Sequence, residues 1–154
     1  MPVGRELEQM GGDKLEFKHQ DLTRKIIGVF YEVYNELGHG FLESVCEAAM
    51  LIALREAGLK AEPQMPIAVY FRGNRVGDFR ADLMVENAVL LELKAARALD
   101  SSHEAQLLNY LRATEIEVGL LLNFGTKPEF KRLAFDNERK KIAGDQNPAA
   151  DIRK

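Results

Sequence analysis

Two acidic residues and one lysine lie in segments where an ordinary buried strand would carry apolar side chains. Asp82 precedes a run of apolar residues, and Glu92 and Lys94 interrupt the apolar segment 89–93. Residues two apart on a strand point to the same face, so Glu92 and Lys94 are expected to project together. If the two strands pair through a turn near Asn87, Asp82 lies beside them. These spacings predict one patch that holds two carboxylates and an ammonium group.

These residue types suit the hydrolysis of a phosphate ester. Two carboxylates about one cation apart can share a hard metal ion such as Mg²⁺, which prefers oxygen ligands. The cation would lower the pKa of a bound water and neutralise charge that builds on a phosphate. Lys94 would orient that water or stabilise the transition-state oxyanion. Without a cation, Asp82 and Glu92 would repel each other, which costs free energy.

The first half of the chain predicts two helices. Apolar residues recur at helical spacing over 22–37, with Asp21 or Thr23 as the N-cap and Gly38 just beyond the C-terminus. A second apolar pattern predicts a helix over 42–57. Because the connecting loop is short, the two helices are expected to pack as a pair.

Strands dominate the remainder. Strands over 67–71 and 76–85 are expected to form a hairpin with a turn at Gly73 and Asn74, and a third strand is expected over 88–94. A capping box of Ser101 and Glu104 is expected to open a helix. A buried strand over 118–124, an edge strand over 130–135 and a basic helix from 137 to about 142 are expected to follow. The resulting order, α-α-β-β-β-α-β-β, predicts an α/β (α+β) fold with helices packed on a mixed sheet.

The length of 154 residues predicts one domain, over 20–143, with flexible termini at 1–19 and 144–154. The net charge of −3 argues against a protein that coats nucleic acid, but it allows an enzyme that contacts nucleic acid locally. The single cysteine, Cys46, excludes a multi-cysteine zinc site and fits a cytoplasmic location. No apolar run approaches the ~20 residues of a membrane span, so no membrane association is expected.

The arrangement of Asp82 and the segment Glu92-Leu93-Lys94 resembles the D-x(n)-(D/E)-x-K core of the PD-(D/E)xK nuclease superfamily, whose restriction-endonuclease-like core also has this element order. Within it, the segment 40–46 resembles the motif of the small bacterial GxxExxY proteins, with Gly40 and Glu43 in place. Cys46 stands where that motif has tyrosine. The segments 106–110 and 118–125 resemble the Q-x-x-x-Y motif and the penultimate strand of that superfamily.

The resemblance implies a metal-dependent nuclease that acts on DNA or RNA with Mg²⁺ or Mn²⁺. The residues it implies as metal ligands are Asp82, Glu92, the Leu93 carbonyl, and Glu43 directly or through water. It implies that Lys94 positions or activates the attacking water. Gln106 and Tyr110, one helical turn apart, would reach the site or the substrate backbone. Cysteine at position 46 fills less volume and hydrogen-bonds less than tyrosine. This difference affects the expected orientation of Glu43 and none of the strand residues.

A second interpretation from the same residues is a binding or regulatory module that retains the fold without catalysis. The small size of the chain, its negative charge and the lack of a DNA-reading element motivate it. Related folds often pair, so a homodimer is compatible with either interpretation.

Overall fold

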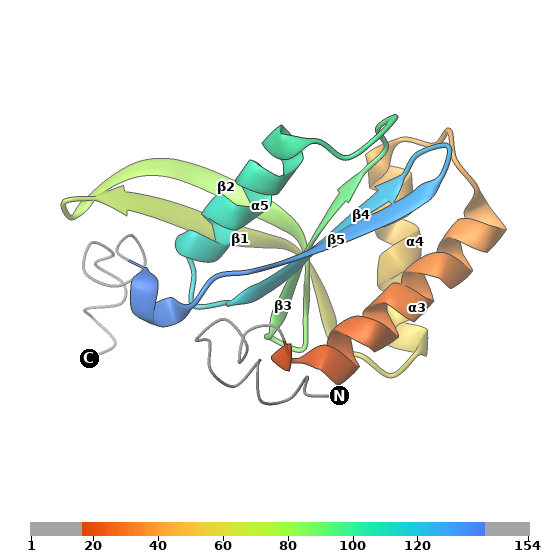
Figure 1. Cartoon of the computed structure of the whole chain (residues 1–154), viewed down its shortest axis with the longest axis horizontal. Helices are drawn as coiled ribbons and strands as arrows, with labels where there is room; N and C mark the ends of the chain where they lie inside the picture. The colour runs from red at the N-terminus through yellow and green to blue at the C-terminus, as the bar shows by residue number, and fades with distance from the viewer. Residues whose placement is uncertain (1–16, 141–154) are drawn as a thin grey trace, which may run out of the picture.

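The structure is a computed structural model, and it describes residues 17–140. A five-stranded sheet has two helices on one face and one helix on the other (Figure 1). The elements in chain order are α3 (Gln20–Leu37), α4 (Glu43–Glu56), β1 (Ala61–Phe71), β2 (Asn74–Val85), β3 (Val89–Lys94), α5 (Ser101–Arg112), β4 (Val118–Phe124), β5 (Pro128–Ala134) and the 3₁₀ turn η1 (Asn137–Arg139). The predicted α+β class and element order are confirmed.

The strands lie in the order β1-β2-β3-β4-β5. All neighbours pair antiparallel except β3 and β4, which are parallel and are connected by the crossover helix α5. β5 is an edge strand, as predicted, and every residue of β4 is buried, as its apolar sequence predicts. Within 17–140, none of the helices is both long and apolar enough to cross a bilayer.

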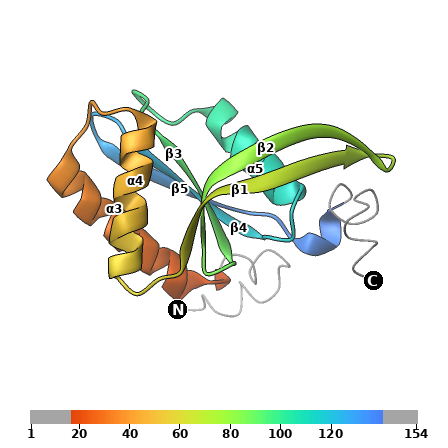
Figure 2. The same cartoon turned by 180° about the vertical axis from the view of Figure 1, so that it is seen from behind.

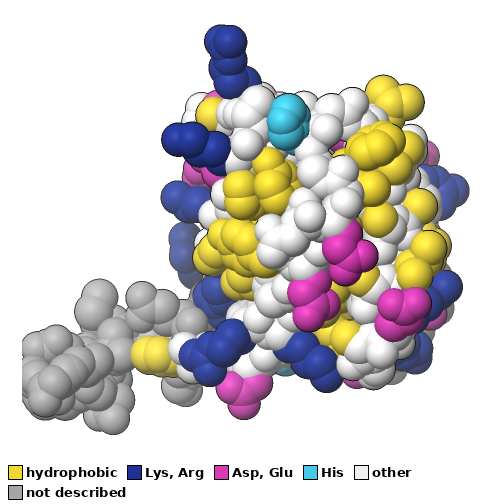
Figure 3. Space-filling view, turned by 90° about the vertical axis from the view of Figure 1, so that its right-hand side faces the viewer, with side chains coloured by type: hydrophobic (Ala, Val, Ile, Leu, Met, Phe, Trp, Pro, Cys, Tyr) yellow, Lys and Arg dark blue, Asp and Glu magenta, His cyan; other side chains and the backbone are white. Residues whose placement is uncertain are grey.

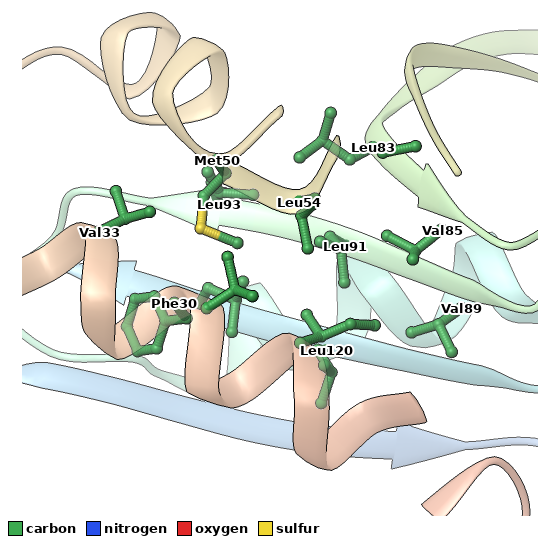
Figure 4. Close-up of a cluster of buried hydrophobic side chains, with 14 of the residues drawn as sticks. Phe30, Val33, Met50, Leu54, Leu83, Val85, Val89, Leu91, Leu93 and Leu120 are labelled. Carbon is green, nitrogen blue, oxygen red and sulfur yellow. The ribbon is translucent and has the colours of Figure 1, made fainter. Parts of the chain in front are cut away.

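The larger core lies between the sheet and the pair α3/α4 (Figure 4). Phe30 of α3 is fully buried and meets Phe124 of β4 edge-on, with ring centroids 5.1 Å apart. Met50 and Leu54 of α4 are also fully buried in this layer. The helical apolar spacing seen in the sequence is therefore the stripe that covers the sheet.

A smaller core lies between the sheet and α5. Leu107 of α5 packs against Gly119 of β4 so closely that a Cβ atom at position 119 would lie 2.9 Å from the Leu107 side chain. The missing side chain at Gly119 thus sets how near α5 approaches the sheet. This distance matters because α5 carries two of the predicted site residues.

The hairpin of β1 and β2 leaves the sheet at Asp82. The β2–β3 ladder covers three pairs and ends at Leu83 opposite Leu91, whereas β1 and β2 stay paired out to the hairpin tip (Figure 2). Ala81 packs in the core under α5, while Leu83 packs in the core under α3/α4. Residues two apart on a flat strand share one face, so β2 must turn sharply at Asp82. Opposite this bend, Gln64 has a left-handed φ of 54°.

The predicted N-cap of α3, Asp21 or Thr23, is wrong. Helix α3 begins earlier than its apolar pattern, with His19 as the N-cap, so Asp21 and Thr23 already lie inside the first turn. The Thr23 N–H donates to the His19 carbonyl at 2.9 Å, a bond that makes Thr23 helical rather than a cap. Gly38 ends α3 with φ 77°, as predicted.

The capping box of α5 is shifted by one residue from the predicted pair Ser101 and Glu104. The Asp100 carboxylate accepts the N–H groups of Ser102 and His103, and the His103 imidazole accepts the N–H of Asp100. A carboxylate at Asp100 provides a stronger acceptor for these amides than a hydroxyl does.

Several predicted boundaries also move. The second helix is shorter, β1 begins at Ala61, and the hairpin turn has positive φ at Arg72 and Gly73, one residue before the predicted pair. The segment after Asn137 forms only one 3₁₀ turn, and the predicted continuation to 142 lies outside the described residues. β1 is longer than predicted because it stays paired with β2 as far as Ala61 opposite Val85, and shifts of one or two residues at the other ends are ordinary.

Candidate active site

The two predicted carboxylates lie where the β2–β3 ladder opens. The Leu93 N–H donates to Asp82 Oδ2 at 2.8 Å, and the Asp82 N–H donates to Glu92 Oε2 at 2.8 Å. Each side chain therefore occupies the gap left by the ended ladder and bonds the opposite strand. The bend at Asp82 opens the gap into which both carboxylates reach.

Burial and mutual repulsion act on these carboxylates together. Glu92 is 4% exposed, and burial, followed by the charge of Asp82, raises its pKa to about 8. Burial is also the largest cause that raises the pKa of Asp82, and the N–H of Leu93 opposes it. Both shifts mean that the pair is poorly stabilised as two anions in the absence of a compensating charge.

Lys94 joins this pair to α5. Glu92 and Lys94 lie on the α5 side of β3, whereas Leu91 and Leu93 pack in the opposite core, as the strand alternation predicts. Lys94 Nζ donates to Gln106 Oε1 at 2.8 Å, and Gln106 Nε2 approaches Tyr110 Oη at 3.4 Å. The predicted residues of α5 thus form a chain of contacts that holds the ammonium group.

The charges of the two carboxylates also affect the pKa of Tyr110. Burial raises the pKa of its phenol, and the charges of Glu92 and Asp82 raise it further. With 7% of its surface exposed, Tyr110 belongs to the core under α5 as well as to the site. Its hydroxyl supports Gln106, and its ring supports the packing of the helix.

Glu43 approaches the site from the opposite layer. It is the first residue of α4, and its Oε2 accepts the N–H of Ala95, next to Lys94, at 3.2 Å. Its charge is among the causes that raise the pKa of Asp82, after burial. Cys46 is buried in the α3/α4 core, so the residue at the motif position contributes to packing.

Two residues near the site were missed by the sequence interpretation. Asn123 is fully buried at the end of β4 and holds the backbone of Ala96 at both its N–H and its carbonyl, each at 2.9 Å. Glu47 accepts a hydrogen bond from Gln64 at 2.7 Å and adds negative charge near Asp82 and Glu92. An amide inside an otherwise apolar strand was the available signal for Asn123.

Carboxylate and carbonyl oxygens are donors that suit hard cations such as Mg²⁺ and Mn²⁺. No three His, Cys, Asp or Glu side chains among residues 17–140 converge in a way that could enclose an ion. Mg²⁺, however, is usually bound through one or two carboxylates and keeps several waters. In an extended strand the N–H and C=O of one residue point to the same neighbour, so the Leu93 carbonyl faces the gap that Asp82 and Glu92 occupy.

One family model matches most of this chain. No curated protein matches the chain. A solved structure described as "Crystal structure of SSO0001" is similar with a TM-score of 0.48 and 18% sequence identity; the match covers 62% of this chain and 52% of that one, so the chain spans about half of its length. The model of the PD-(D/E)XK nuclease superfamily matches residues 20–133. The chain therefore belongs to the PD-(D/E)XK nuclease superfamily.

Proposed function

We propose that the protein is a nuclease that hydrolyses phosphodiester bonds of DNA or RNA with Mg²⁺ or Mn²⁺. The observation that carries this proposal is the contact of Lys94 with Gln106 beside the carboxylates of Asp82 and Glu92. A buried carboxylate, a half-buried carboxylate and a half-buried ammonium group at the open end of a strand pair have the composition of a phosphoryl-transfer site.

Asp82, Glu92 and the Leu93 carbonyl would hold the cation, and Glu43 would act through water. When bound, the cation supplies a water of lowered pKa and neutralises charge on the phosphate. Lys94 positions the water that attacks phosphorus and stabilises the negative charge of the transition state. Gln106 keeps Lys94 aimed at that position, because its carboxamide accepts one of the three ammonium protons.

The first experiment measures cleavage of labelled single- and double-stranded DNA and RNA with Mn²⁺. Replacement of Glu92 by Gln or of Lys94 by Ala should lower the rate by about 100-fold or more, since the first removes an anionic ligand of the cation and the second removes the ammonium that stabilises the transition state. Cleavage that is unchanged in both variants would exclude the mechanism.

The chain contains a matched control for both substitutions. Lys131 and Glu104 form an ion pair of 3.7 Å on the surface near α5, with 52% and 38% of the side chains exposed. The variants Lys131→Ala and Glu104→Gln remove the same charges outside the site, and they should change the rate by less than about twofold. An equal loss in the controls would point to general electrostatics instead.

Metal binding is tested separately by titration calorimetry with Mn²⁺. Asp82→Asn should weaken binding, because it removes one anionic ligand while it keeps the size of the side chain. Binding that is equal in Asp82→Asn and the original protein would remove Asp82 from the ligand set.

A second candidate is the non-catalytic module, and the surface of α3 and α4 favours it. Leu42 and Ile52 on this side are 75% and 59% exposed, and hydrophobic side chains gather on this face of the molecule (Figure 3). Exposed apolar patches are typical of surfaces that bind other proteins. Mn²⁺ binding without turnover of any tested substrate would support this candidate, and turnover that depends on Lys94 would exclude it.

A further inference from the structure

A groove of about 560 Å³ lies between the projecting hairpin and α5, beside the candidate active site. The residues that line it are Val69, Phe79, Ser102, Ala105, Gln106, Asn109, Tyr110 and Ala113. Gln106 and Tyr110 belong to both the groove and the chain of contacts around Lys94. The groove is therefore continuous with the site, and a molecule whose phosphate is held there can place its neighbouring group in the groove.

The groove has an aromatic wall formed by Phe79. This side chain is 47% exposed, and its ring centroid lies 5.9 Å from that of Tyr110. A Cβ atom at Gly77 would lie 2.9 Å from the Phe79 ring, so the glycine provides the space in which the ring rests against the hairpin. A large aromatic ring supported on one side and accessible on the other is suited to stacking with a planar ligand.

The polar groups of the groove are uncharged. Ser102, Gln106 and Asn109 lie along α5. Both polar atoms of Gln106 are engaged with Lys94 and Tyr110, and the Ser102 hydroxyl donates to the Asp100 carboxylate at 2.5 Å. The Ser102 oxygen can still accept a hydrogen bond, and the Asn109 carboxamide can still donate one. Charged groups outside the lining contact these side chains: Lys94 bonds Gln106, Arg112 approaches Asn109 at 3.4 Å, and the Asp100 carboxylate accepts from Ser102. An apolar groove with carboxamides and flanking positive charge complements a planar base attached to a negatively charged backbone.

We propose that this groove binds one unpaired nucleobase of the substrate strand, stacked on Phe79 and contacted at its edge by the side chains of Ser102 and Asn109. The inference rests on the proposed function, because it takes the strand to enter through the site of Asp82, Glu92 and Lys94. A base inside a duplex is already stacked and paired, so only a single strand or an extruded nucleotide can fill the groove. The preferred substrate is therefore unpaired nucleic acid.

The test measures binding rather than cleavage, with labelled oligonucleotides and the Glu92→Gln protein, which keeps the strand intact. Phe79→Ala should weaken binding of a single strand by about fivefold or more, since base stacking on an aromatic side chain contributes this much. Phe79→Trp should retain the affinity. A 2-aminopurine base in the strand should lose fluorescence on binding to the original groove and keep it with Phe79→Ala.

Phe71 provides the matched control. It lies on the same hairpin with a similar exposed fraction, 51%, but outside the groove. Phe71→Ala should change single-strand affinity by less than about twofold. Equal losses for Phe71→Ala and Phe79→Ala, or a duplex bound as tightly as the single strand, would overturn the proposal. Thermal unfolding of each variant verifies that the fold is retained.

A scan with abasic nucleotides separates this inference from the proposed function. One abasic position should weaken binding to the original groove, and the same position should have no further effect with Phe79→Ala. If hydrolysis occurs but no position is coupled to Phe79, the groove assignment is wrong and the nuclease proposal stands. If a position is coupled to Phe79 but no strand is hydrolysed, the base-binding groove stands and the nuclease proposal fails.

Discussion

The two faces of the sheet differ in what their side chains do. The face covered by α3 and α4 is a broad apolar layer in which aromatic and aliphatic side chains are fully buried. The face covered by α5 has a smaller apolar cluster and carries Glu92 and Lys94 among its residues. The α5 face also borders the groove at Phe79. The larger apolar core and most of the candidate site residues thus lie on opposite sides of the same strands, with Glu43 of α4 as the exception.

The α5 face carries an ionisable group, Glu92, whose burial costs stability. Glu92 is held almost out of water with a pKa raised by burial and by Asp82. Buried groups of like charge destabilise a fold. The free energy of unfolding must therefore come mainly from the apolar face, which offsets the cost of burying Glu92 near Asp82. Apolar burial under α3 and α4 contributes enough stability for the fold to keep an open strand pair and a charged site on the other face.

The largest expected effect is on the apolar face. Phe30→Ala should lower the free energy of unfolding by about 3–5 kcal/mol, because it removes a fully buried ring that packs against Phe124. Urea unfolding followed by circular dichroism measures this loss. A loss below about 1 kcal/mol would contradict the view that this layer dominates stability.

A smaller loss is expected where α5 meets the sheet. Gly119→Ala should cost about 1–3 kcal/mol, because the added methyl group meets Leu107 at 2.9 Å. In a Leu107→Ala background, Gly119→Ala should cost less than it does in the original protein, because the clash is gone, as a double-mutant cycle in urea would measure. Strictly additive losses would indicate that the two positions do not contact each other.

The pH dependence of stability tests the charged groups beyond the site. Lys140 donates to the carbonyls of Thr114 and Ile116, which follow α5, and burial lowers its pKa to about 8. From about pH 8 to 10 the unfolded chain keeps this proton while the folded chain has lost it, so stability rises with pH. The two hydrogen bonds to carbonyls favour the charged form and so limit the rise to about 1 kcal/mol.

Lys140→Met should remove this rise, as urea unfolding at pH 8 and pH 10 would measure. The comparison is made at each pH with the original protein, so that the titration of other groups cancels. A rise that persists unchanged in Lys140→Met would assign the pH dependence to another group.

The smallest effect on stability is expected at the groove. Phe79→Ala removes a side chain that is 47% exposed, so the free energy of unfolding should fall by less than about 1 kcal/mol. Thermal unfolding measures this difference. A loss as large as that of Phe30→Ala would mean that Phe79 serves packing, and the contrast between the two faces would be lost.

Local patterns predicted the fold class and much of the candidate site. Alternation along 89–94 placed Glu92 and Lys94 on one face, and helical spacing placed Gln106 beside Tyr110; both placements appear in the structure. The caps were less predictable, since several neighbouring residues can accept the same N–H groups. Asp100 caps α5 in place of Ser101 because its carboxylate reaches two amides at once.

The sequence by itself determined the elements and the face on which each charged residue projects, because these follow from periods of two and 3.6 residues along the chain. Only the tertiary structure decided that β2 turns away from β3 at Asp82 and that Asn123 holds the backbone of Ala96. It also decided that Phe79 and α5 enclose a groove. These features depend on where ladders end and on contacts between residues far apart in the chain, and no local period encodes such distances.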